Sequence, residues 1–124
     1  MKTTFFQHVY SYRQLCLKKD MREIALWGEI LEMINEEIGY LLQTEKKLIN
    51  NYELGIKIQD LRRKIILCSA SLCRYEQNLK NELEYGKNKY DESNIVLHEQ
   101  HREKYFSLIQ YYQQLKNKLY KYLT

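Results

Sequence analysis

The sequence predicts an all-α protein: an elongated antiparallel bundle of three long helices, preceded by a short N-terminal helix. Three observations support this fold class. The 124 residues contain no proline and four glycines, so no residue forces a long helix to stop. Apolar residues recur in alternating three- and four-residue steps in three separate segments, as in helices that pack on partner helices. Short polar stretches separate the segments, which makes sequential helices antiparallel.

Each segment carries an apolar stripe typical of coiled-coil packing. Additional apolar residues flank each stripe and widen it, which favours a bundle of three or more helices over a two-stranded seam. Glu45 occupies one seam position of the first stripe. The stripes are Ile24, Trp27, Leu31, Ile34, Ile38, Leu41 and Leu48; then Ile58, Leu61, Ile65, Cys68, Leu72, Tyr75 and Leu79; and finally Tyr105, Leu108, Tyr112, Leu115, Leu119 and Tyr122.

A separate short helix is expected before residue 20. Asp20 followed by Glu23 resembles a capping box, which would start the first long helix just after two lysines. The apolar residues ahead of it do not share the phase of the first long stripe. No strong helix breaker occurs near residues 18–20, so one continuous helix over residues 4–50 is the alternative. The short stripe consists of Phe5, Val9, Tyr12 and Cys16.

Two turns divide the remaining chain into long helices. The paired asparagines and the glycine of "NNYELG" at residues 50–55 predict the first turn. The second falls in "YGKNKYDESN", where Gly86 stops one helix and Asp91 or Ser93 caps the next. The expected long helices therefore cover residues 20–50, 56–86 and 92–123, within a single domain of residues 1–124.

Composition indicates a cytoplasmic protein without a membrane segment. The most apolar run, "IILCSASLC", has nine residues and is too short to span a bilayer. The N-terminus lacks the continuous apolar stretch of a signal peptide. Cys16, Cys68 and Cys73 show no metal-binding or disulfide spacing, which suits a reducing compartment. Richness in Lys, Asn, Tyr and Ile is typical of AT-rich genomes, and indicates a bacterial or phage protein.

Two of the three histidines extend the third stripe backward, so His98 and His101 are both expected in the seam. Residues three apart share a helix face, and the topology brings His8 to a similar height, so a metal site is one alternative. However, "HEQH" is one residue shorter than the metalloprotease motif, and two ligands make a poor zinc site. We therefore expect hydrogen-bonded seam histidines, with no metal or other cofactor.

No pattern of residues predicts catalysis. The serines lie outside any nucleophile-elbow context, and no glycine-rich phosphate loop occurs. Acidic residues are scattered among basic ones, as on solvated helix faces. The chain is therefore expected not to be an enzyme.

The last segment carries a face of lysine and tyrosine. The net charge is +4, and no acidic residue follows Glu103. Tyrosines interleaved with lysines can stack on bases beside phosphate contacts, which makes a nucleic-acid-associated protein an alternative. Tyrosine is also enriched at protein interfaces, and one arginine in this segment is few for a nucleic-acid module. The residues of this face are Lys104, Tyr111, Lys118 and Lys121.

Together these features predict a non-enzymatic helical bundle that acts through protein–protein contacts, as a scaffold, adaptor or regulatory subunit. Self-association into a homo-oligomer is expected, because Glu45 and the histidines interrupt otherwise apolar seams. Such polar residues can select register or oligomeric state. Nucleic-acid binding through the lysine and tyrosine face is one alternative, and metal binding through His98 and His101 is the other.

Overall fold

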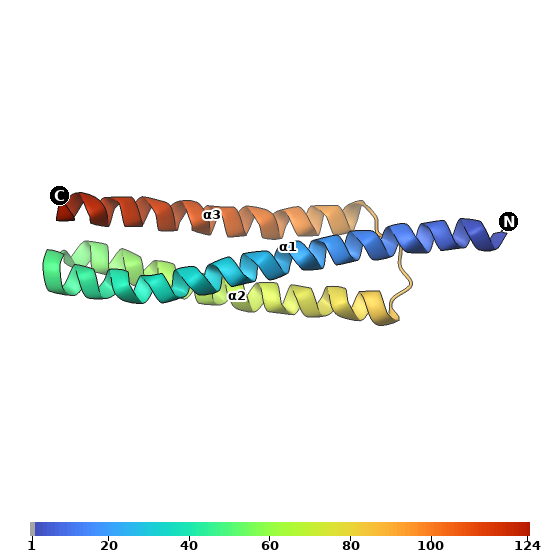
Figure 1. The fold of residues 1–124 in the computed structure, drawn as a ribbon, viewed down its shortest axis with the longest axis horizontal. Coiled ribbons are helices and arrows are strands. Elements are labelled where there is room, and N and C mark those ends of the chain that lie inside the picture. Colours follow the sequence, from blue (N-terminus) through green and yellow to red (C-terminus); the bar gives the residue numbers. More distant parts are fainter. Residues whose placement is uncertain (1) are drawn as a thin grey trace.

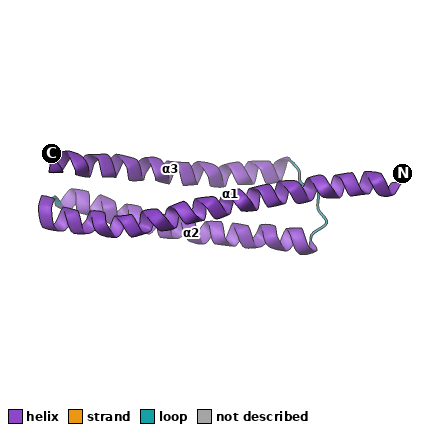
Figure 2. Cartoon of the chain, viewed as in Figure 1, coloured by secondary structure: helices purple, strands orange, loops and turns teal. Residues whose placement is uncertain are grey.

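A computed structural model describes the backbone of residues 2–124 and the side chains of residues 11–124. The helices are α1 (Lys2–Thr44), α2 (Tyr52–Tyr85) and α3 (Glu92–Leu123), and a short π-helical turn, η1 (Glu45–Ile49), extends α1. Figure 1 shows the three helices side by side in an elongated rod, with the start of α1 projecting past the other two. The described residues contain no strand, and loops connect only the helix ends (Figure 2). The predicted all-α antiparallel bundle is confirmed.

The separate N-terminal helix is not observed, because α1 runs without a break through residues 18–20. Asp20 was expected to cap a helix, but its side chain is only 4% exposed and points into the bundle. The Tyr90 hydroxyl donates a hydrogen bond to the Asp20 carboxylate. This partner from the loop between α2 and α3 takes the place of the helix N–H groups that a cap would bind. The alternative of one continuous helix is therefore correct.

The turn between α1 and α2 is shorter than expected and consists of two asparagines. Asn50 adopts a left-handed conformation, with φ of 56°, and its N–H donates to the Glu45 carbonyl at 2.7 Å. Asparagine tolerates this conformation at a helix end better than most residues do. Asn51 then caps α2 by accepting a hydrogen bond from the Leu54 N–H at 3.2 Å. Gly55 lies inside α2 and is not part of the turn.

The second loop ends as the sequence predicts. Gly86 terminates α2, and its N–H donates to the Glu82 carbonyl at 2.9 Å. Asp91 caps α3, because its side chain accepts from the Ser93 N–H at 3.0 Å. In turn, the Asn94 side chain accepts a hydrogen bond from the Asp91 N–H at 3.0 Å, which completes a capping box.

The core follows the three predicted stripes except at their ends. Leu48 is 72% exposed and Tyr122 is 53% exposed, although both were expected in the seam. Leu48 lies in the wider π-helical turn, which rotates it out of phase with the stripe. Tyr122 lies at the end of the rod, where its hydroxyl accepts a hydrogen bond from the Asn51 amide at 2.8 Å. The buried polar residues among those described are Arg13, Asp20 and His98.

Candidate functional site

The first candidate site is a buried polar cluster around His98, which is 4% exposed. The Nδ1 atom of His98 lies 3.0 Å from the Tyr75 hydroxyl of α2. The Nε2 atom lies 3.2 Å from Glu23 Oε1 and 3.5 Å from Asp20 Oδ1, both on α1. The imidazole also stacks on the Trp27 ring, with centroids 5.3 Å apart. Both ring nitrogens are therefore held by partners from the two other helices.

The two carboxylates of this cluster have further partners of their own. Arg102 donates to Glu23 Oε2 at 2.8 Å. Burial alone would raise the pKa of Glu23, but the Arg102 guanidinium and the His98 ring bring this pKa below its ordinary value. Burial, with the hydrogen bond to Asp20, raises the pKa of Tyr90, so the Tyr90 hydroxyl keeps its proton and donates. Because its pKa is lowered, Glu23 is ionised at neutral pH.

Asp20, Glu23 and His98 form a group that could ligate a metal ion. One ligand atom from each residue lies within 4.8 Å of the others, and no other group of three or more such residues occurs in the described part of the chain. Sequence reasoning identified His98 but missed both carboxylates. Asp20 was interpreted as a helix cap, and Glu23 as its capping-box partner. The signal that could have found them is their three-residue spacing on one helix, at the height of His98.

The other histidine candidates do not join this group. The His101 ring is half-buried and stacks on the Tyr75 ring, with centroids 4.1 Å apart and planes at 12°. Burial, followed by the nearby Lys104 charge, lowers the pKa of His101 and favours its neutral form. The side chain of His8 lies outside the described residues. The structure therefore brings two α1 carboxylates to His98 in place of a second histidine.

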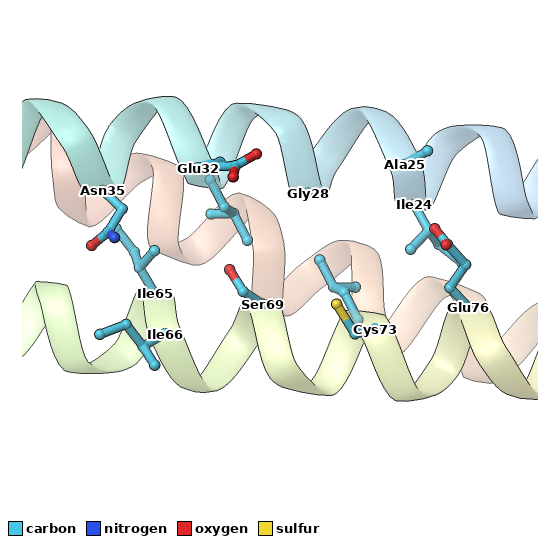
Figure 3. A pocket seen from close by; sticks show the side chains of 12 residues that line it. Ile24, Ala25, Gly28, Glu32, Asn35, Ile65, Ile66, Ser69, Cys73 and Glu76 are labelled. Atoms are coloured by element: carbon cyan, nitrogen blue, oxygen red, sulfur yellow. The ribbon is translucent and has the colours of Figure 1, made fainter.

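The second candidate site is a groove between α1 and α2, shown in Figure 3. Its volume is about 410 Å³, and its floor is formed by core residues of both helices. Small side chains line much of it, and Gly28 contributes none at all. An added Cβ at Gly28 would meet no atom within 4 Å. The lining residues are Ile24, Ala25, Gly28, Leu31, Glu32 and Asn35 of α1, and Ile65, Ile66, Ser69, Leu72, Cys73 and Glu76 of α2.

The two helices that border the groove differ in the charged residues they carry along their length. From Glu23 to Glu45 the α1 helix and its extension carry six acidic residues with no lysine or arginine among them, and Glu29, Glu32 and Glu36 are exposed. On α2 the groove lining contains the acidic Glu76, and basic residues lie outside the lining, on either side of an uncharged stretch, residues 65–73. These basic residues are Arg62, Arg63, Lys64 and Arg74.

In the predicted lysine and tyrosine face of α3, the tyrosine packs on α2 and the lysines are exposed to solvent. The Tyr111 hydroxyl lies within hydrogen-bonding distance of Asp60, at 3.3 Å, and of the Lys57 carbonyl, at 3.4 Å. The Lys64 ammonium lies 5.1 Å from the centroid of the Tyr111 ring. Tyr111 therefore anchors α3 to α2. The remaining members of the face, all exposed, are Lys104, Lys118 and Lys121.

Comparison with known proteins adds no family to this description: no family model, curated protein or solved structure matches the chain. Within the described residues, no helix has a stretch that is both long enough and apolar enough to cross a bilayer. The two sites are therefore interpreted from their geometry alone.

Proposed function

We propose that the chain is a non-enzymatic helical bundle that acts through protein–protein contacts, as a scaffold, adaptor or regulatory subunit. The contact we propose is with a second copy of the chain, through the groove between α1 and α2. The observation that carries this proposal is the groove itself, which is large, partly apolar and lined by small residues. Its occupant would be the equivalent hairpin of the second copy.

Small side chains in the groove support close packing against another helix. Gly28 on α1 and Ser69 on α2 lie at the middle of the groove, with Ala25 and Cys73 beside them. The distance between packed helices depends on the side chains at their contact, so small residues let a further helix approach closely. No helix of the same chain covers the groove, because α3 lies behind α1 and α2 on the far side of the hairpin (Figure 3).

Charge supports a second copy as the occupant. A two-fold axis that runs parallel to the helices and brings two grooves face to face places α1 of one copy over α2 of the other. The acidic α1 helix of one copy then lies along the α2 helix of the other, which carries Arg62 and Arg74 on either side of its uncharged stretch. Opposite charges arranged in this way stabilise the correct pairing and speed the encounter of the two chains. The same hairpin thus supplies both halves of the complementary surface.

A buried polar atom without a hydrogen bond and an exposed apolar side chain at the groove also favour an occupant. The Oδ1 atom of Asn35 is buried and accepts no hydrogen bond from the described part of the chain. Buried polar atoms in folded proteins are nearly always paired, so a donor from the second copy would complete this site. Ile66 lines the groove and is 55% exposed, and its burial against a second copy would add hydrophobic stabilisation.

The experiment compares two variants of helical glycines on α1. Gly28→Leu places a large side chain in the groove, and Gly39→Leu places the same side chain outside it. Neither added Cβ would contact an atom within 4 Å, so both variants are expected to fold. Sedimentation equilibrium of the untagged chain should give a dimer for the wild type and for Gly39→Leu. Gly28→Leu should give a monomer, with the same helical content by circular dichroism.

A wild-type chain that stays monomeric at tens of micromolar would overturn the proposed self-association. So would a Gly28→Leu variant that dimerises as tightly as the wild type. The nucleic-acid alternative has less support, because Tyr111 contacts α2 through both its hydroxyl and its ring. A tyrosine held in this way presents less of its ring for stacking on a base.

A further inference from the structure

We propose that Asp20, Glu23 and His98 form a binding site for a divalent transition-metal ion, such as zinc, that joins α1 to α3. This inference is independent of the proposed dimer, because none of the three proposed ligands lines the groove. Imidazole and carboxylate together are ligands that zinc and its neighbours in the first transition row accept. The ligands come from two helices, so a bound ion would link the last helix of the bundle to the first.

The spacing of the ligand atoms suits a single ion. Two ligands of a tetrahedral zinc ion lie about 3.4 Å apart when each bond is about 2.1 Å long. The Nε2 atom of His98 lies 3.2 Å from Glu23 Oε1 and 3.5 Å from Asp20 Oδ1. Small side-chain movements would therefore place all three atoms around one ion. The backbone would not need to move.

The atoms on the far side of each ligand are already held in place. The Tyr75 hydroxyl bonds the other ring nitrogen of His98 at 3.0 Å, which leaves Nε2 directed at the carboxylates. Tyr90 bonds the second oxygen of Asp20, and Arg102 bonds the second oxygen of Glu23. Such outer partners orient metal ligands in proteins, and their removal typically weakens binding by about 10- to 100-fold.

The site also has an entry path and room for further ligands. A cavity of about 260 Å³ is bordered by all three proposed ligands. A three-ligand site of this kind would keep an open position, which water could fill. The surrounding charge favours a cation, because three carboxylates (Asp20, Glu23 and Glu99) face two basic groups. Those basic groups are Arg102 and Lys19.

The test is zinc titration of the untagged chain after treatment with a chelator. We expect one zinc ion per chain by isothermal titration calorimetry, and a higher melting temperature in the presence of zinc. His98→Ala should abolish both effects. Asp20→Asn, which keeps the size of the side chain, should weaken binding at least 100-fold. His101→Ala is the matched control, three residues further along α3, and should bind zinc as the wild type does.

The proposal is overturned if the wild-type chain binds no zinc at 100 micromolar free ion. It is also overturned if zinc binding survives in both His98→Ala and Asp20→Asn, or if His101→Ala abolishes binding equally. Circular dichroism of each variant without zinc shows whether it is folded, and Asp20→Asn decides the question if His98→Ala is not. A variant that loses zinc binding but still dimerises as the wild type does would show that the metal site and the groove act independently.

Discussion

The Nδ1 atom of His98 and the hydroxyl of Tyr75 are joined by a buried hydrogen bond of 3.0 Å. Tyr75 lies on α2 and His98 on α3, and the other ring nitrogen of His98 reaches Glu23 of α1. One imidazole of α3 thus contacts both other helices at the same level of the rod. A buried polar group that loses its hydrogen-bond partner destabilises the folded state. Removal of either partner of this hydrogen bond should therefore lower the stability of the bundle.

Tyr75→Phe should lower the free energy of unfolding by about 1–3 kcal/mol, because it removes one hydroxyl and leaves His98 Nδ1 without that partner. The ring itself and its contact with His101 are retained. Urea unfolding followed by circular dichroism measures the change. Tyr85→Phe is the control, because Tyr85 is 78% exposed and should unfold like the wild type. Equal stabilities for both variants would show that the hydrogen bond contributes nothing.

Leu115→Asp should unfold the bundle or make its unfolding non-cooperative. Leu115 is 4% exposed in the third stripe, and a carboxylate there would be buried without a partner. Lys118→Glu, three residues further along α3, changes an exposed side chain and should leave the melting temperature within a few degrees of the wild type. Thermal unfolding by circular dichroism compares the two. A Leu115→Asp chain that melts as the wild type does would contradict the packing of α3.

Stability should fall at acidic pH partly through Glu37. The hydrogen bonds from Lys116 and Tyr112 lower the pKa of Glu37 below its ordinary value of 4.5. A pKa lowered by folding stabilises the folded state above the unfolded-state pKa, and the stabilisation is lost as pH falls through the folded-state pKa. The effect should be below about 1 kcal/mol, because the pair is partly exposed to solvent.

Urea unfolding at pH 7 and at pH 3 checks this contribution of Glu37. Glu37→Gln should be less stable than the wild type at pH 7 and lose less stability on acidification. Glu36→Gln is the control, because Glu36 is exposed and precedes Glu37 on the same helix. If Glu37→Gln and the wild type lose the same stability on acidification, the ion pair with Lys116 makes no contribution.

Gly39→Ala should stabilise the chain by up to about 1 kcal/mol, because alanine has the higher helix propensity. The added Cβ would meet no atom within 4 Å, so no contact opposes the gain. Gly55→Ala should gain less, since its Cβ would lie 3.1 Å from the Glu45 carboxyl group, which must move. Chemical unfolding of the two variants measures the difference. A larger gain at Gly55 would show that local crowding is unimportant there.

Much of the fold could be predicted from the sequence, because helix periodicity and capping are local properties. The Asp91 capping box and the end of α2 at Gly86 depend only on residues close in sequence. The N-terminal break was wrong because Asp20 has two competing roles. As a cap it would bind N–H groups of its own helix, but the fold brings Tyr90 to it from the second loop. No local pattern contains that partner.

The candidate sites were harder to predict from the sequence than the fold was. His98 was predicted in the seam from its spacing, but its carboxylate partners on α1 depend on how α3 is rotated against α1. The groove was not predicted, because it depends on which residues of α1 and α2 the fold places next to each other. The groove forms where the fold places Gly28 of α1 opposite Ser69 of α2.

The most direct test of the proposed contact is the alkylation rate of Cys73, a free and exposed cysteine in the groove. In a Cys16→Ser, Cys68→Ala background, iodoacetamide should modify Cys73 more slowly as the protein concentration rises and the groove becomes covered. A cysteine placed at the exposed Ser107 of α3, by Ser107→Cys in a chain that also carries Cys73→Ser, should react at one rate throughout. A Cys73 rate that is the same in dilute and concentrated protein would contradict self-association through the groove.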